Sequence, residues 1–175
     1  PYDAKGLLLA ALADPDPVLF FEPKRIYRAI RQEVPEGAYT EPLGRAKVVR
    51  EGDGVSVIAF GSMTPIALRA AELAAEKGLS VEVVDLRTVW PLDVETVVGS
   101  IAKTGRCVVV HEAPRSAGLG GELVSLIQER AFDHLAAPVQ RVVGFDTAVP
   151  YYRMENYYLP NDKRILAAVE RAAAF

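Results

Sequence analysis

Hydrophobic and polar residues follow two patterns that alternate along residues 46–175. Short apolar runs rich in valine, typical of buried strands, occupy residues 47–50, 55–60, 80–86, 106–110 and 140–143. Longer segments with apolar residues at helical spacing occupy residues 64–77, 92–103, 121–134 and 162–174. Strands that alternate with helices of these lengths predict an α/β fold, in which a mostly parallel sheet carries helices on both faces.

Signals at the ends of the predicted helices agree with this pattern. Thr64 is expected to cap a helix that has Pro65 at its first position, where a missing backbone N–H costs nothing. Gly78 and Gly105 follow the last apolar positions of two helices, as glycine often does at a helix C-terminus. The run 52–54, Gly-Asp-Gly, predicts a turn after a short edge strand.

The first 45 residues do not follow this alternation. Residues 3–13 predict a helix, and the continuous apolar run 18–21 predicts a buried strand. One helix and one strand do not cover both faces of a sheet, so we interpret residues 1–22 as a helix-strand remnant of a preceding α/β domain. Residues 23–45 are punctuated by proline and glycine, which indicates an extended connector. The main domain then comprises residues 46–175.

Composition and charge exclude several function classes. The chain has 175 residues and a formal net charge of −3, which argues against a nucleic-acid surface because such surfaces are basic. No apolar run approaches the roughly 18 residues of a membrane helix, and the N-terminus does not resemble a signal peptide. Cys107 is the single cysteine and lies in an apolar run, where it is expected to be a small buried hydrophobe. A reducing, cytoplasmic setting fits this cysteine usage.

A glycine-rich loop, residues 117–122, joins a predicted strand to a predicted helix. Glycines in this position can let a phosphate approach the helix N-terminus, which would indicate a nucleotide-binding α/β domain. The dinucleotide fingerprint requires a third glycine, however, and this loop lacks it. The interpretation favoured by the residues is close backbone packing or a mobile loop before the helix.

Polar residues follow two of the predicted strands. Asp85 ends one strand, where a turn role or a salt bridge to Arg87 is expected. His111 and Glu112 end another strand and are an acid–base pair by residue type. Two histidines without further spaced ligands do not make a metal site, and the chain has no Gly-x-Ser-x-Gly motif of a hydrolase. Polar contacts at an interface are therefore the predicted use of His111, Glu112 and Arg115.

Four tyrosines lie in a segment that contains no predicted helix or strand: Tyr151, Tyr152, Tyr157 and Tyr158. Tyrosine and arginine are enriched at buried protein interfaces. The segment is therefore expected either to form an interface or to pack on its own domain.

Taken in order, these motifs resemble the beta subunits of thiamine-diphosphate-dependent 2-oxo acid dehydrogenases of the pyruvate or branched-chain type. The N-terminal part resembles the end of their pyrimidine-binding domain, over residues 2–8, 14–18 and 21–28. The rest resembles their transketolase C-terminal domain, over residues 84–88, 91–93, 103–106, 111–114, 144–151 and 158–160. The chain also begins without a methionine, so we expect a C-terminal fragment of such a subunit.

The resemblance implies an α2β2 heterotetramer that decarboxylates a 2-oxo acid on thiamine diphosphate and passes the acyl group to lipoamide. It also implies that the carboxylate which activates the cofactor lies upstream of Pro1, and that the alpha subunit holds the diphosphate and its magnesium. The fragment itself is then expected to be inactive, with no catalytic, cofactor-binding or metal-binding residues. The implied setting is the cytoplasm, or the mitochondrial matrix in a eukaryote.

The implied partners are the alpha subunit, a second beta subunit and the basic binding domain of a dihydrolipoyl acyltransferase. A chain-terminal carboxylate takes part in docking in some members, and Phe175 would supply it here. An acidic docking residue of some members is replaced by Ala136. The residues expected to serve assembly or docking are Asp85, Arg87, Trp90, His111, Glu112, Arg115, Asp146, Tyr151, Tyr152 and Phe175.

Two other functions stay open from the sequence. One is the nucleotide-binding domain, which depends on the glycine-rich loop alone. The other is part of a transketolase-type enzyme, because such enzymes share the C-terminal domain. The run 21–24, Phe-Glu-Pro-Lys, favours the dehydrogenase.

Overall fold

A five-stranded sheet with the order β1-β3-β2-β4-β5 forms the centre of the computed structural model, which describes residues 1–175. The strands are β1 (Lys47–Arg50), β2 (Val55–Ala59), β3 (Val81–Asp85), β4 (Cys107–Pro114) and β5 (Gln140–Gly144). β2, β3, β4 and β5 run parallel, and β1 pairs antiparallel with β3 at one edge. The predicted α/β class with a mostly parallel sheet is confirmed.

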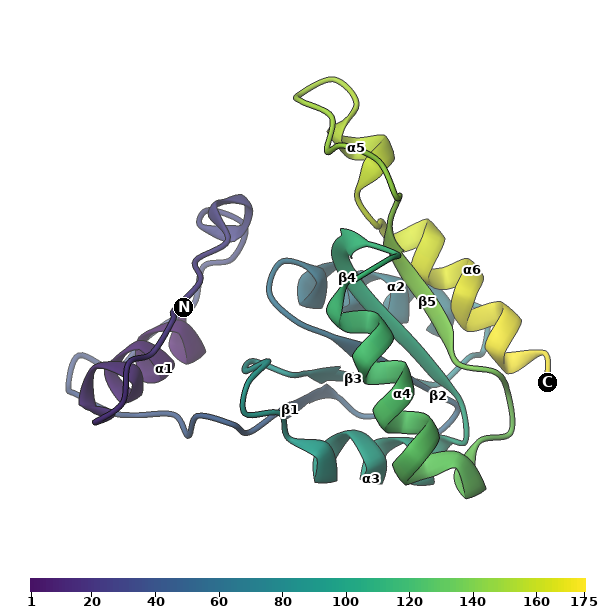
Figure 1. The fold of residues 1–175 in the computed structure, drawn as a ribbon, viewed down its shortest axis with the longest axis horizontal. Coiled ribbons are helices and arrows are strands. Elements are labelled where there is room, and N and C mark those ends of the chain that lie inside the picture. The colour runs from purple at the N-terminus through teal and green to yellow at the C-terminus, as the bar shows by residue number, and fades with distance from the viewer.

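Two pairs of helices cover the two faces of this sheet (Figure 1). On one face lie α2 (Met63–Ala75) and α6 (Asp162–Ala173), and on the other lie α3 (Val94–Thr104) and α4 (Leu119–Ala131). Side chains of a strand point alternately to the two faces. Accordingly, Val108 and Val110 of β4 join a cluster of 17 buried residues under α2 and α6. Cys107 and Val109 join a cluster of 10 under α3 and α4.

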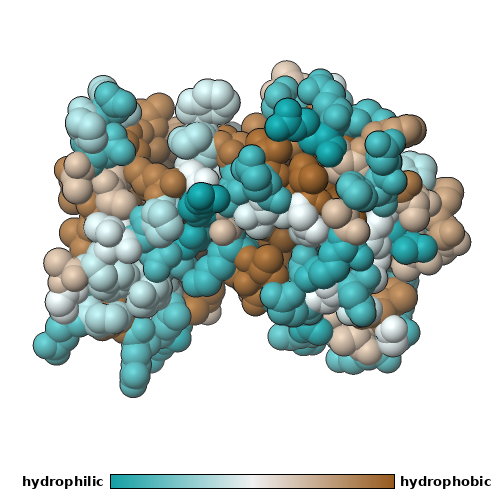
Figure 2. Space-filling view, turned by 90° about the horizontal axis from the view of Figure 1, so that it is seen from below, coloured by the Kyte–Doolittle hydropathy of each residue, from teal (hydrophilic) through white to brown (hydrophobic).

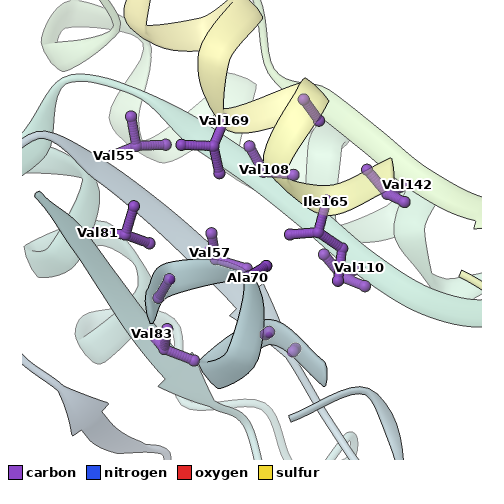
Figure 3. Packing of buried hydrophobic residues seen from close by; sticks show 14 of the residues in the cluster. Val55, Val57, Ala70, Val81, Val83, Val108, Val110, Val142, Ile165 and Val169 are labelled. Atoms are coloured by element: carbon purple, nitrogen blue, oxygen red, sulfur yellow. The ribbon is translucent and has the colours of Figure 1, made fainter. Parts of the chain in front are cut away.

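Figure 3 shows the larger cluster, in which Ile165 and Val169 of α6 point onto the valines of the sheet. The facing helix α2 contributes mainly alanines, including Ala67, Ala70 and Ala71. Small side chains on α2 allow its backbone to lie close to the strands and to α6. Helices therefore shield both faces of the central strands from water, which explains why the sequences of these strands are continuous apolar runs.

The first 45 residues stand beside this domain as an arm, with α1 (Tyr2–Ala13) and one turn of 3₁₀ helix, η1 (Lys24–Ile26) (Figure 1). The arm is held together by the stacked rings of Tyr2 and Tyr39, 4.6 Å apart, and by the Lys5 ammonium, which donates to the Gly37 carbonyl at 3.0 Å. The strand predicted at 18–21 is wrong. A strand needs a neighbour for its backbone hydrogen bonds, and no strand of the chain lies alongside these residues.

Several predicted helix ends move by a few residues. α2 begins at Met63 after Ser62, so Thr64 is not its cap. α3 begins at Val94, later than predicted, because the Asp93 carboxylate accepts the backbone N–H of Thr96 at 3.1 Å and caps the helix. Gly105 ends that helix with φ +70°, as predicted.

The largest differences surround β4 and the segment after β5. β4 extends to Pro114, and α4 begins at Leu119 within the glycine-rich loop. α4 ends at Ala131 and continues as a short 3₁₀ turn, η2 (Phe132–His134). The short helix α5 (Glu155–Tyr158) was not predicted, because four residues are too few to show a helical period.

Candidate functional site

His111, in the middle of β4, lies beneath the glycine-rich loop. Its side chain is 1% exposed, and the backbone N–H of Gly120 donates to its Nε2 at 3.0 Å. A Cβ added at Gly118 would lie 2.7 Å from the ring Cε1, and one added at Gly120 would lie 2.3 Å from Nε2. The glycines are therefore required because the imidazole occupies the space that a side chain would need. This confirms the predicted close backbone packing and leaves no room for a phosphate on that side of the loop.

These contacts determine which ring nitrogen of His111 carries the proton. Burial, and to a smaller extent the nearby Arg141 guanidinium, lower the pKa of His111. Since Nε2 accepts a hydrogen bond, the neutral ring carries its proton on Nδ1, which is buried without a partner. His111 therefore holds the loop in place, and it is not available at the surface for the interface contact predicted from the sequence.

Glu112 points away from His111 toward the start of α2. Its carboxylate accepts a hydrogen bond from the Ser62 hydroxyl. Burial raises the pKa of Glu112, Arg25 lowers it and Glu155 raises it further. The structure thus brings together Glu112 and Ser62 from the carboxyl ends of two parallel strands, and it does not form a histidine–glutamate acid–base pair.

Asp85 and Arg87 hold the turn after β3. The Asp85 carboxylate accepts the backbone N–H of Arg87 at 3.0 Å, so the predicted turn role is observed. Burial raises the pKa of Asp85. The salt bridge between these two residues is not formed, because the Arg87 guanidinium reaches Asp3 at 3.1 Å and Glu41 at 2.7 Å.

Arg87 therefore links the arm to the domain. Its side chain is only 6% exposed, and it also donates to the Arg45 carbonyl at 3.0 Å. Lys47 binds the same Asp3 carboxylate at 3.2 Å. Arg87, predicted to contact a partner subunit, is instead occupied within the chain.

Asp146 ties the loop after β4 to the loop after β5. Its carboxylate accepts the backbone N–H and the hydroxyl of Ser116, each at 2.8 Å, and these bonds lower the pKa of Asp146. The carbonyl of Arg115 accepts a hydrogen bond from Arg141 at 3.2 Å, while Arg115 itself is exposed. Asp146 and Arg115 therefore shape one surface next to the tyrosine-rich segment.

The segment 145–158, here called the aromatic loop, projects from the domain at the top of Figure 1. Tyr151 is 95% exposed and Tyr152 is 88% exposed, whereas Tyr158 is 3% exposed and packs edge-on against Phe145. Each of the two expectations for this segment, an interface and packing on its own domain, thus holds for different residues. Tyr158 packs on its own domain, and Tyr151 and Tyr152 present their rings to the surroundings.

Other large apolar side chains are also exposed. Trp90, after β3, is 87% exposed, and Phe175 is 69% exposed. On the arm, Leu12, Leu19 and Phe21 are 74%, 85% and 81% exposed. Figure 2 shows apolar side chains uncovered on the left, where Figure 1 places the arm. Large apolar side chains that are exposed in such numbers indicate interaction surfaces.

The single cysteine and the possible metal ligands are the candidate parts of a catalytic or metal centre. Burial raises the pKa of the Cys107 thiol to about 12, so this cysteine is inert as a nucleophile. No three histidine, cysteine, aspartate or glutamate side chains gather as metal ligands. None of the helices combines the length and apolar character that crossing a bilayer requires.

The fold and the loops agree with a comparison against known protein families. The family described as transketolase, C-terminal domain, matches residues 44–165. The chain belongs to the transketolase C-terminal domain family. The match begins close to β1 and ends within α6, so it covers the whole sheet and most of the helices on both of its faces.

Similar proteins extend this family assignment over the arm. The chain is 50% identical over 173 residues to the pyruvate dehydrogenase E1 component subunit beta of Acholeplasma laidlawii, covering 99% of this chain and 53% of that protein. It is 47% identical over 176 residues to the mitochondrial 2-oxoisovalerate dehydrogenase subunit beta of Dictyostelium discoideum, covering 100% of this chain and 47% of that protein. The chain thus spans about half the length of these relatives.

A solved structure shows the same fold. The split-gene transketolase described as an inactive beta4 tetramer is 29% identical, with a TM-score of 0.69 over 82% of this chain and 46% of that one. The resemblance stated from the motifs, to beta subunits of pyruvate and branched-chain 2-oxo acid dehydrogenases, is therefore confirmed.

Proposed function

We propose that this chain is the C-terminal part of the beta subunit of a 2-oxo acid dehydrogenase and serves to assemble the enzyme. The single observation that carries the proposal is the aromatic loop, because it holds two nearly bare tyrosines on a domain whose relatives are beta subunits. Exposed rings of this size stabilise a protein only when a partner covers them, since burying each removes a large apolar area from water.

The parent enzyme would oxidatively decarboxylate a 2-oxo acid on thiamine diphosphate and transfer the acyl group to lipoamide. Residues 1–175 do not fit that cofactor or its magnesium. They gather no metal-ligating cluster, and the imidazole of His111 fills the space beneath the glycine-rich loop. The cofactor would then be held by chain outside these residues and by the alpha subunit.

The proposed division of the chain has three parts. Residues 46–175 would fold as the transketolase C-terminal domain, residues 23–45 would connect it, and residues 1–22 would be the tail of the pyrimidine-binding domain. The exposed apolar residues of the arm, Leu12, Leu19 and Phe21, support this assignment, because in a complete subunit the rest of that domain would cover them.

The proposed partners are the alpha subunit, a second beta subunit and the basic binding domain of a dihydrolipoyl acyltransferase. Of the residues expected to contact them, Trp90, Arg115, Tyr151, Tyr152 and Phe175 are exposed. Asp85 holds the turn before Trp90, Asp146 ties the aromatic loop to the loop after β4, and Glu112 binds Ser62, so these three would shape the surface. The net charge of −3 supports the approach of a basic domain.

The aromatic loop gives the test of this proposal. In the chain alone, a bare aromatic surface should pair with a second copy, so sedimentation velocity should show association that increases with concentration. The double substitution Tyr151→Ser and Tyr152→Ser should weaken it about tenfold or more, because tyrosines are frequent hot spots of interfaces.

Phe132→Ser is the matched control, since Phe132 is 62% exposed but lies after α4, outside the aromatic loop. It should leave the association unchanged. A strictly monomeric wild-type chain at high concentration would count against the proposal, and so would equal association of the wild type and the double variant.

A further inference from the structure

A small hollow at the free edge of the sheet is lined by three arginines. It lies between β5 and α6, has a volume of about 220 Å³, and is formed by Arg141, Val142, Arg164, Ala167 and Arg171. β5 is the last strand of the sheet, and α6 runs beside it on the right of Figure 1. The hollow belongs neither to the aromatic loop nor to the glycine-rich loop.

The spacing of residues along α6 creates this hollow. Positions 164, 167 and 171 are three and four residues apart, so they lie on one stripe of the helix. The stripe is distinct from the buried face, which carries Ile165, Ala168, Val169 and Ala172. Ala167 is the small residue between the two arginines, and its short side chain leaves the space open.

The three guanidinium groups have no negative partner. None of the salt bridges of the chain includes Arg141, Arg164 or Arg171. Arg164 donates to the carbonyls of Val143 at 2.6 Å and Tyr158 at 3.3 Å. Arg171 donates to the side-chain oxygen of Gln140 at 3.4 Å.

These acceptors hold the arginines without neutralising them. A guanidinium has five N–H donors, so each arginine keeps several donors for another acceptor. Burial lowers the pKa of Arg164, whose guanidinium carbon also lies 4.8 Å from the centre of the Phe145 ring, so its contacts are with uncharged groups. In a chain whose net charge is −3, three unpaired cations around one hollow need a separate explanation.

We propose that Arg141, Arg164 and Arg171 form a binding site for a phosphate group carried by a small molecule. Guanidinium groups match the oxygens of phosphate with paired hydrogen bonds, and several of them together suit an anion of charge −2. Val142 and Ala167 line the hollow without adding charge.

Calorimetric titration of the 175-residue chain with inorganic phosphate tests the site, with chloride at equal ionic strength as the reference. The wild type should bind one phosphate saturably. Arg171→Gln should weaken binding roughly tenfold, the cost of one charged hydrogen bond. Ala167→Leu should abolish binding by filling the hollow while keeping every charge.

Arg130→Gln is the matched control, because Arg130 is exposed on α4 and the substitution removes the same charge. It should bind phosphate like the wild type. Absence of saturable phosphate binding by the wild type would overturn the proposal, as would equal weakening by Arg130→Gln and Arg171→Gln.

The source of the phosphate group is a second arm of the same experiment. Glycerol phosphate should bind at least as tightly as inorganic phosphate, whereas a phosphoserine peptide should bind more weakly, because the hollow is small. Binding of the peptide alone would overturn the small-molecule assignment. The arginine variants should leave the self-association through the aromatic loop unchanged, so the two proposals can fail separately.

Discussion

Gly120→Ala should destabilise the domain by about 2–4 kcal/mol, through overpacking and the loss of a buried hydrogen bond. The added Cβ would lie 2.3 Å from Nε2 of His111, the atom that accepts the Gly120 N–H. In an open helix the same change would be favourable, since alanine is the better helix former. The clash should outweigh that gain because His111 is buried and cannot move aside.

Gly121→Ala provides a matched control in the same turn of α4. The nearest atom to its added Cβ is Nη1 of Arg141, at 3.8 Å, which is an ordinary contact. This variant should be neutral or more stable by up to about 1 kcal/mol. Urea unfolding of both variants measures the difference, and equal stabilities would show that His111 does not fill the space beneath the loop.

A double variant separates the clash from other causes. Removing the imidazole with His111→Ala opens a cavity and destabilises the domain by itself. In the Gly120→Ala, His111→Ala double variant the added methyl group has room, so the two costs should sum to more than the measured loss. If the losses of the two single variants simply add in the double variant, Gly120→Ala destabilises the domain by a cause other than a clash with His111.

Arg87→Met should lower the stability of the contact between the arm and the domain by about 1–3 kcal/mol, less than the roughly 3–5 kcal/mol for breaking a fully buried ion pair. The reduction is smaller than for a fully buried pair because Asp3 is 38% exposed. Without the guanidinium, Glu41 and Asp3 lose their common cation, and only Lys47 still binds Asp3. Hydrogen exchange of the α1 amides should therefore become faster.

The exposed pair of Arg69 and Glu72 is the control for Arg87. Arg69→Met removes an ion pair of 2.8 Å whose side chains are more than half exposed, and such pairs contribute little. Protease cutting within residues 23–45 is a second readout, because a released arm exposes its connector. Arg69→Met should change neither the hydrogen exchange of the α1 amides nor this cutting. If Arg87→Met also leaves both unchanged, the arm is not held by this arginine.

The sequence was most informative where burial dictates residue type. Valine-rich runs such as 55–60 and 106–110 predicted the strands, because both faces of the sheet are covered and only apolar residues fit. The run 18–21 has the same apolar character, and its prediction as a strand failed. An apolar run does not reveal whether a neighbouring strand is present to accept its hydrogen bonds.

The candidate site was predicted less well, because exposure and pairing depend on distant residues. Nothing local distinguishes Tyr158, which is buried against Phe145, from Tyr151, which is bare. Similarly, the partners of Arg87 lie 84 and 46 residues away. The arginine hollow had a detectable signal, since Arg164 and Arg171 are seven residues apart on one helix face, but its third arginine comes from β5.

Calorimetric titration of the 175-residue chain carrying Ala167→Leu, which fills the arginine hollow, with thiamine diphosphate and magnesium tests the central claim most directly, namely that these residues serve assembly and hold no catalytic centre. A complete 2-oxo acid dehydrogenase titrated in the same buffer serves as the positive control. The account predicts no saturable heat for the chain, because its residues gather no metal-ligating cluster and His111 fills the space beneath the glycine-rich loop. Saturable binding of the cofactor by the chain alone would contradict the account.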